Sequence, residues 1–165
     1  MKKLILLAAL AAFGGHAFAG GKDTYPHYEG EVATGYAVGV SESYINLDRF
    51  VFETVHGVRI NEYVFAGAGV GLNIFTGFED LAIPVILPAF VNAKGYYPVS
   101  DKFSVYASLD LGAAVGIVDA EGTNFYTSVG PGLQVGGKTA FDFGIRYQHL
   151  GSGTGAMLFR IGVRF

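Results

Sequence analysis

Residues 103–117 alternate between two kinds of side chain for fifteen residues without a break. Every odd position is apolar, and the even positions are small or polar except for Tyr106. Successive side chains of a β-strand point to opposite faces, so the segment is predicted to be one strand with an apolar face and a polar face. Strands of globular proteins usually have about five or six residues. A strand of this length suits a membrane crossing better than a small globular sheet.

The same alternation recurs in eight segments. They are residues 30–40, 49–60, 63–75, 83–97, 103–117, 124–136, 140–149 and 156–165. Three connections are short and have turn-forming residues, at 61–62, 98–102 and 137–139. The other four are longer, at 41–48, 76–82, 118–123 and 150–155. Short turns at one end and longer loops at the other are typical of an outer-membrane barrel.

The barrel geometry agrees with the length of the chain. An apolar band about 25 Å tall, crossed by strands tilted by roughly 40°, needs on the order of ten residues per strand. Eight crossings and their turns fill the chain, and ten strands would leave no room for loops. We therefore predict an all-β fold, an eight-stranded antiparallel up-and-down transmembrane β-barrel. Pro84 and Pro88 disfavour regular pairing and predict a bulge or a weakly paired stretch in the fourth segment.

The first residues have the three parts of a secretory signal. Lys2 and Lys3 are followed by an apolar run from Leu4 to Phe13, and the pattern Ala17-Phe18-Ala19 precedes a cleavage point. Ten apolar residues are too few for a helix that spans a bilayer. We expect residues 1–19 to be a signal peptide, 20–28 an N-terminal periplasmic segment and 29–165 the barrel.

If the bulky apolar face of each strand contacts lipid, the charged residues face the lumen. An outward Arg or Lys would cost about 2–4 kcal/mol near the bilayer midplane. The predicted lumen side chains are Arg49, Glu53, Arg59, Asn73, Asp110, Gln134, Asp142, Arg146, Arg160 and Arg164. Asn92 and Lys94 join them if the fourth strand keeps its phase after Pro88. We expect a packed network in which Glu53, Asp110 and Asp142 pair with arginines, and the alternative is an ion or small-solute path.

The last residues form an amphipathic strand. Its apolar row is Met157, Phe159, Ile161, Val163 and Phe165. This row, with the signal peptide and the eight segments, resembles the small eight-stranded outer-membrane barrels of OmpA-domain or OmpX type. The resemblance implies that the barrel-assembly machinery reads Phe159, Ile161, Val163 and Phe165 as an assembly signal. It also implies a monomer in the Gram-negative outer membrane, in contact with lipid and lipopolysaccharide. Aromatic residues near strand ends (Phe75, Tyr96, Tyr97 and Tyr147) are expected to form a girdle.

Composition excludes several other classes of protein. The chain has no cysteine, which excludes disulfide scaffolds and Cys-ligated metals, and its net charge of −3 disfavours nucleic-acid binding. The histidines have no ligand-like spacing, so we expect no metal site and no cofactor. The longer loops are acidic, with Glu42, Glu79, Asp80, Asp119 and Glu121.

A search for catalytic residues gives one partial motif. Lipid A deacylases use a His-x-Ser pair late in the barrel followed by a carboxylate, and His149 with Ser152 resembles this pair in part. The spacing is one residue too long, and no Asp or Glu follows Asp142. We therefore expect a non-enzymatic outer-membrane barrel with a structural or surface-interaction role. The alternatives are a lipid A-modifying barrel enzyme and a secreted lipocalin-like binder of apolar ligands, which would have its apolar face inward.

Overall fold

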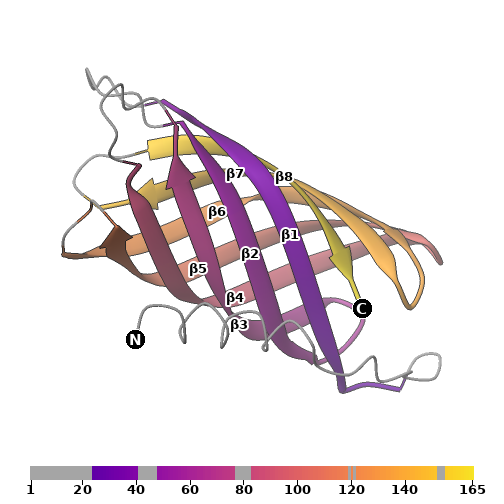
Figure 1. Cartoon of the computed structure of the whole chain (residues 1–165). Helices are drawn as coiled ribbons and strands as arrows, with labels where there is room; N and C mark the ends of the chain where they lie inside the picture. The colour runs from indigo at the N-terminus through magenta and orange to yellow at the C-terminus, as the bar shows by residue number, and fades with distance from the viewer. Residues whose placement is uncertain (1–23, 41–47, 77–82, 119, 121, 152–154) are drawn as a thin grey trace.

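A computed structural model describes residues 24–40, 48–76, 83–118, 120, 122–151 and 155–165. Eight antiparallel strands form one closed barrel, in which each strand pairs with the next and β8 returns to β1 (Figure 1). The strands are β1 (His27–Gly39), β2 (Arg49–Arg59), β3 (Val64–Phe75), β4 (Val85–Ser100), β5 (Phe103–Val118), β6 (Thr123–Gly136), β7 (Ala140–Leu150) and β8 (Gly155–Arg164).

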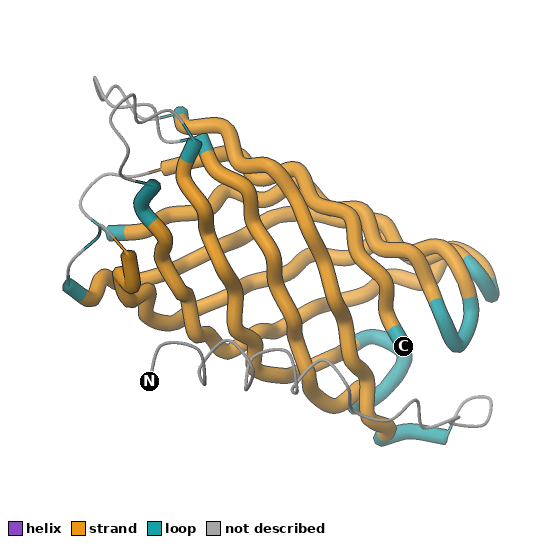
Figure 2. The backbone as a smooth tube through the Cα atoms, viewed as in Figure 1, coloured by secondary structure: helices purple, strands orange, loops and turns teal. Residues whose placement is uncertain are grey.

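The expected eight-stranded up-and-down barrel is confirmed. Strand ends differ from the expected ones by three residues at most, at the start of β1 and the end of β4. Strand β1 begins at His27, just before the barrel boundary expected at residue 29. The expected signal peptide, residues 1–19, lies outside the described residues. Figure 2 shows that most of the described chain is strand, joined by loops at the two ends of the barrel.

No helix among the described residues is long and apolar enough to cross a membrane.

The two prolines of the fourth segment have different positions. Pro84 precedes β4, and the pairing of β4 with β5 shifts between Val85 and Ile86, which is the expected irregularity. Pro88 lies inside the strand, fully buried, and pairs with Ala114. The strand keeps its phase afterwards, so Asn92 and Lys94 both face the lumen.

The two faces of the barrel wall have opposite character. Most outward positions are exposed and apolar, and every strand has them; examples are Val32, Phe52, Val70, Val91, Leu111, Val129, Phe143 and Ile161. Inward positions are buried and carry almost all the charge of the strands. The lumen also holds aromatic rings, including Phe65, Phe90, Tyr106 and Tyr126.

Two of the four residues expected in an aromatic girdle are interior residues instead. Phase places Phe75 and Tyr96 on the inward faces of β3 and β4, where both are buried. Tyr97 and Tyr147 point outward as expected and are exposed. The prediction for Phe75 and Tyr96 was wrong because it used distance from the strand end and ignored parity along the strand.

Candidate functional site: the packed polar lumen

All eight charged residues predicted for the lumen network lie on the inward faces of their strands. Seven are buried, and Arg164 lies at the mouth, at the end with the short turns. The eight are Arg49, Glu53, Arg59, Asp110, Asp142, Arg146, Arg160 and Arg164. The uncharged members Asn73 and Gln134 are buried as well.

Glu31, which is not among the acids predicted for the lumen, is the centre of the network. Its two carboxylate oxygens accept hydrogen bonds from Lys94 of β4 and Arg160 of β8. All three side chains are at most 4% exposed. One carboxylate therefore joins three strands, and it balances two cations in a space from which water is largely excluded.

A second acid–base group lies farther toward the end with the longer loops. Arg146 Nη1 donates to Asp110 Oδ2 at 2.7 Å, and Asn92 Nδ2 donates to the other oxygen of the same carboxylate. Glu53 Oε2 lies 4.0 Å from Arg146 Nη1 and 3.8 Å from Arg160 Nε. Arg160 therefore links this group to Glu31, because it forms ion pairs with both Glu53 and Glu31.

Tyr106 of β5 and Asp142 of β7 also belong to the network. The phenol of Tyr106 donates to Asp142 Oδ1 at 2.5 Å, and Arg160 Nη1 lies 3.8 Å from the same oxygen. Gly132 on β6 makes this possible because a Cβ atom there would collide with the ring of Tyr106. The glycine thus sets the position of the phenol that binds Asp142.

Near the longer loops the network continues through neutral groups. Arg49 donates to Gln148 Oε1 from Nε at 3.0 Å and from Nη2 at 2.6 Å. Gln148 Nε2 donates to the Tyr126 hydroxyl at 3.1 Å, and that hydroxyl donates to Glu53 Oε1 at 3.3 Å. The chain of contacts is therefore unbroken from Arg49 to the middle of the barrel.

At the end with the short turns, Glu29 closes the lumen. Its Oε2 accepts from Arg164 Nη1 at 2.8 Å and lies 3.5 Å from Arg59 Nη1. The guanidinium of Arg59 stacks 3.5 Å from the ring centre of Tyr96 and donates to the carbonyls of Asn61 and Glu62 in the β2–β3 turn. These side chains cover the mouth and hold it to the adjacent turn.

Sequence reasoning missed several members of this network. Glu29, Glu31, Tyr96 and Tyr126 were not assigned to it, although Glu31 shares the parity of Ala33 and Gly35 on the small and polar face of its strand. That parity was a usable signal. The choice of partners across the lumen was not, because it depends on how the strands are tilted and staggered around the barrel.

The charged side chains of the lumen contact one another across the barrel. Buried charges are costly unless they are paired and hydrogen-bonded. Each charged side chain described above has at least one hydrogen-bond partner, and some of their buried nitrogen and oxygen atoms, such as Arg146 Nε and Nη2, have none. Among the described residues, no group of three or more His, Asp or Glu side chains could hold a metal ion. His149 lies on the outward face of β7, away from the network, and Ser152 lies outside the described residues.

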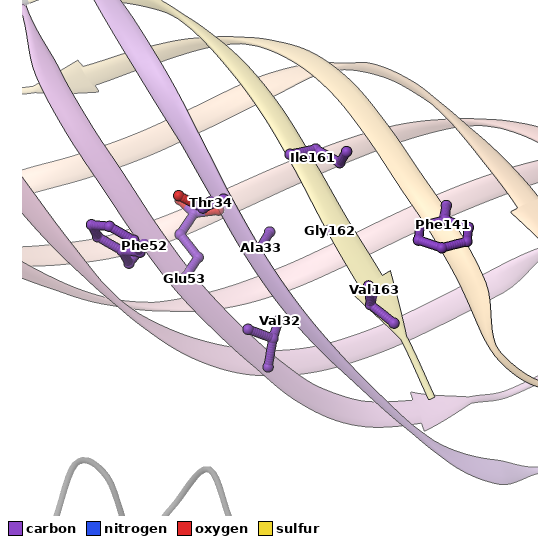
Figure 3. Close-up of a pocket in the computed structure, with 9 residues that line it drawn as sticks. All are labelled: Val32, Ala33, Thr34, Phe52, Glu53, Phe141, Ile161, Gly162 and Val163. Atoms are coloured by element: carbon purple, nitrogen blue, oxygen red, sulfur yellow. The ribbon is translucent and has the colours of Figure 1, made fainter.

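A shallow groove of about 290 Å³ runs on the outside of the barrel along the β1–β8 seam (Figure 3). Its walls are apolar outward side chains, among them Val32, Phe52, Phe141 and Ile161. The paired residues Ala33 and Gly162 of the seam line it as well. Thr34 and Glu53, a member of the lumen network, also line the groove.

The fold, the apolar outward band and the charged interior together define a small eight-stranded barrel of the outer-membrane type. This agrees with the resemblance to barrels of the OmpA-domain or OmpX type.

Comparison with known proteins gives the same fold. Neisserial surface protein A (NspA) superposes with a TM-score of 0.69 at 15% identity, covering 83% of this chain and 95% of that one. Ail, the attachment invasion locus protein of Yersinia pestis, in complex with the heparin analogue sucrose octasulfate, gives 0.56 at 18%, covering 84% and 99%. The outer membrane enzyme PagL gives 0.53 at 10%, covering 82% and 98%. No family model and no curated relative matches the chain.

Proposed function

We propose that this chain is a non-enzymatic outer-membrane barrel with a structural or surface-interaction role in a Gram-negative envelope. The observation that carries the proposal is a network of buried side chains, which runs through the lumen from Arg49 at one end to Arg164 at the other by way of Tyr126, Arg160, Tyr106 and Tyr96. A filled lumen leaves the outer wall and the loops as the surfaces available for function. An ion or solute path would instead need a gap through this network from one mouth of the barrel to the other.

The apolar wall supports the proposed location. Its outward side chains are too exposed and too apolar for water on every strand, and lipid is the solvent they suit. The barrel neighbours support an outer-membrane location, which requires export by the expected signal peptide of residues 1–19. The expected partners are outer-membrane lipid, lipopolysaccharide and the barrel-assembly machinery, with a monomer as the functional unit.

The charge of the longer loops predicts which surface partners this chain would not bind. Ail is seen with a heparin analogue, which is strongly anionic. The four longer connections of this chain contain several acids and neither Lys nor Arg. A sulfated polyanion would be repelled there, so we propose that any loop partner is neutral, cationic or bridged by divalent cations.

Fractionation with a heat-shift gel tests the proposal. The full chain is expressed in a Gram-negative host, and outer-membrane fractions are run unboiled and boiled. A closed barrel in the outer membrane sediments with that fraction and changes mobility on boiling. A soluble periplasmic protein with no shift would overturn the proposal and favour the lipocalin-like alternative.

A lipid A-modifying enzyme is the second candidate. It is favoured by one observation, that His149 lies outward, one residue from the end of β7 nearest the longer loops. Its cross-strand neighbours are Thr127 and Gly155, and neither can orient an imidazole as a carboxylate does. This is why we place the non-enzymatic role first.

A further inference from the structure

The first and last strands meet at a site on the outer wall that the lumen network does not use. Phe165 pairs with Gly30, and the two residues exchange backbone hydrogen bonds of 2.8 and 2.9 Å. The Phe165 ring covers Gly30 so closely that a Cβ atom on Gly30 would lie 2.7 Å from the ring. Gly30 is therefore buried although it faces outward.

Two further residues complete this site, which we call the Phe165 seat (Tyr28, Gly30 and His56). The His56 ring meets the Phe165 ring edge-on, with 6.5 Å between ring centres. The Tyr28 ring is nearly parallel to the His56 ring, at 6.1 Å between ring centres, and its hydroxyl also lies near Gly30. Residues from β1 and β2 thus form a pocket for one aromatic side chain from the end of β8.

Hydrogen bonds fix the orientation of His56 in this seat. Thr54 donates its hydroxyl proton to the carbonyl of Glu31 at 3.2 Å, so its oxygen must accept the proton of His56 Nε2, 2.9 Å away. In a neutral imidazole Nδ1 is then an acceptor, and the Tyr28 hydroxyl donates to it at 2.5 Å. The side-chain polar groups of Thr54, His56 and Tyr28 each have a hydrogen-bond partner. This permits a histidine on an otherwise apolar wall.

The seat distinguishes between registers of the β1–β8 seam. A slip of one residue would turn the wall inside out, but a slip of two preserves which face is apolar. Among the outward positions of β1, which run from Tyr28 to Val38, Gly30 alone lacks a side chain. A slip of two would set the Phe165 ring against Tyr28 or Val32. We propose that the Phe165 seat is the site that selects the register in which the barrel closes.

The β1–β8 seam, where this site lies, is expected to be the last strand pair to form. The seven other strand pairs join neighbours in the chain, whereas the seam joins residues more than a hundred positions apart. Contacts of such separation carry the largest loop-closure cost and are expected to form last. A site that accepts a single register is most useful at this final step. The inference rests on the fold and does not depend on the proposed function.

The test compares two outward glycines in strands. Gly30→Val fills the seat, and Gly95→Val on β4 is the matched control because a Cβ there meets nothing within 4 Å. Each full-length variant is refolded from urea into detergent micelles, and the folded fraction is followed on unboiled gels. We expect Gly30→Val to fold at least about tenfold more slowly than the parent, the effect of a steric clash in a packed site, and Gly95→Val to fold at the parent rate.

Cross-linking reads the register directly, because the chain has no cysteine of its own. Val32→Cys with Val163→Cys reports the observed register, in which positions 32 and 163 pair. Val32→Cys with Ile161→Cys reports the slip of two that sets Phe165 against Tyr28, and Thr34→Cys with Val163→Cys reports the slip of two that sets Phe165 against Val32. Paired Cα atoms about 5.5 Å apart are within disulfide range. We expect a cross-link of a slipped register only when Gly30→Val is present.

A double variant covers the case in which Gly30→Val does not fold. Phe165→Ala removes the ring that the new side chain would meet, so Gly30→Val should add no further slowing in that background. The proposal is overturned if Gly30→Val slows folding as much without the ring as with it. It is also overturned if Gly30→Val folds at the parent rate and yields only the cross-link between positions 32 and 163.

Discussion

Arg146 donates a hydrogen bond of 2.7 Å to Asp110 across the lumen, and both side chains are fully buried. The two residues are 36 positions apart on β7 and β5, which are not neighbours in the barrel wall. Their contact therefore reports how the wall curves and how its strands are staggered. A buried pair of this kind is weak evidence for net stability but strong evidence that neither partner is tolerated alone.

Removing one member of this pair should destabilise the barrel. Arg146→Met leaves Asp110 buried with Asn92 as its remaining donor, and we expect a loss of about 3–5 kcal/mol of unfolding free energy. The measurement is the urea midpoint in detergent micelles, scored by gel mobility. Adding Asp110→Leu removes the uncompensated charge and should restore most of the loss. A double variant no better than the single one would show that the pair itself, and not the orphaned charge, supplies the stability.

Loss of the Glu31 carboxylate should lower the free energy of unfolding more than loss of the Glu29 carboxylate, although each carboxylate contacts two cations. Lys94 has no second carboxylate within ion-pair distance among the described residues. Arg59 and Arg164 keep carbonyl partners in the adjacent turns when Glu29 is lost. We expect Glu31→Gln to cost about 3–5 kcal/mol and Glu29→Gln less than half of that, in the same urea assay. Equal losses would contradict the central role assigned to Glu31.

The sequence predicted the strands and their faces because both depend on local information. Parity alone placed Arg49, Asp110 and Arg160 inside, and it would have placed Glu31 there had the polar face of its strand been read for charge. The pairing of side chains across the lumen does not depend on local information. That Lys94 reaches Glu31, or that Tyr106 reaches Asp142, follows from the stagger of strands that do not touch, and no single segment of sequence encodes it.

Pro88 shows where a local rule has an exception. Proline lacks the N–H of a ladder bond and is expected at edges or bulges. Here the bulge lies two to three residues earlier, between Val85 and Ile86, and the β3–β4 ladder is interrupted opposite Pro88. Gly71 on β3 leaves room for the ring, since a Cβ there would lie 3.0 Å from Pro88 Cγ. The accommodation depends on a neighbouring strand and so was not visible in the segment itself.

Gly132→Ala should disturb the contact between Tyr106 and Asp142. The added methyl group collides with the Tyr106 ring, which must move away from the carboxylate it binds. We expect a loss of about 1–3 kcal/mol, as for other overpacked interiors. Gly95→Ala is the control and should change stability by about 0.5 kcal/mol or less. If the two variants unfold at the same urea concentration, the ring of Tyr106 is not held in place by the small residue at 132.

The filled lumen predicts a barrel that does not pass solutes. Vesicles that contain the refolded protein should not swell in small sugars, because Glu29, Glu31 and Glu53 with their buried partners occupy the lumen at three levels. A general porin in matched vesicles is the positive control, and the heat-shift gel verifies that the test protein is folded. Swelling at a rate near that of the porin would show that the network opens in a membrane.

His149→Ala should leave lipid A unchanged. The acid closest before it in the sequence, Asp142, is on the opposite face of β7 and is engaged by Tyr106 and Arg160. The imidazole therefore lacks the carboxylate that would orient and activate it for attack on an ester. Lipid A is extracted from cells with the parent, the variant and no protein, and its acyl chains are counted by mass spectrometry. Identical spectra are expected from all three. A species with fewer acyl chains that occurs with the parent and disappears in His149→Ala would establish the enzymatic alternative and displace the structural role.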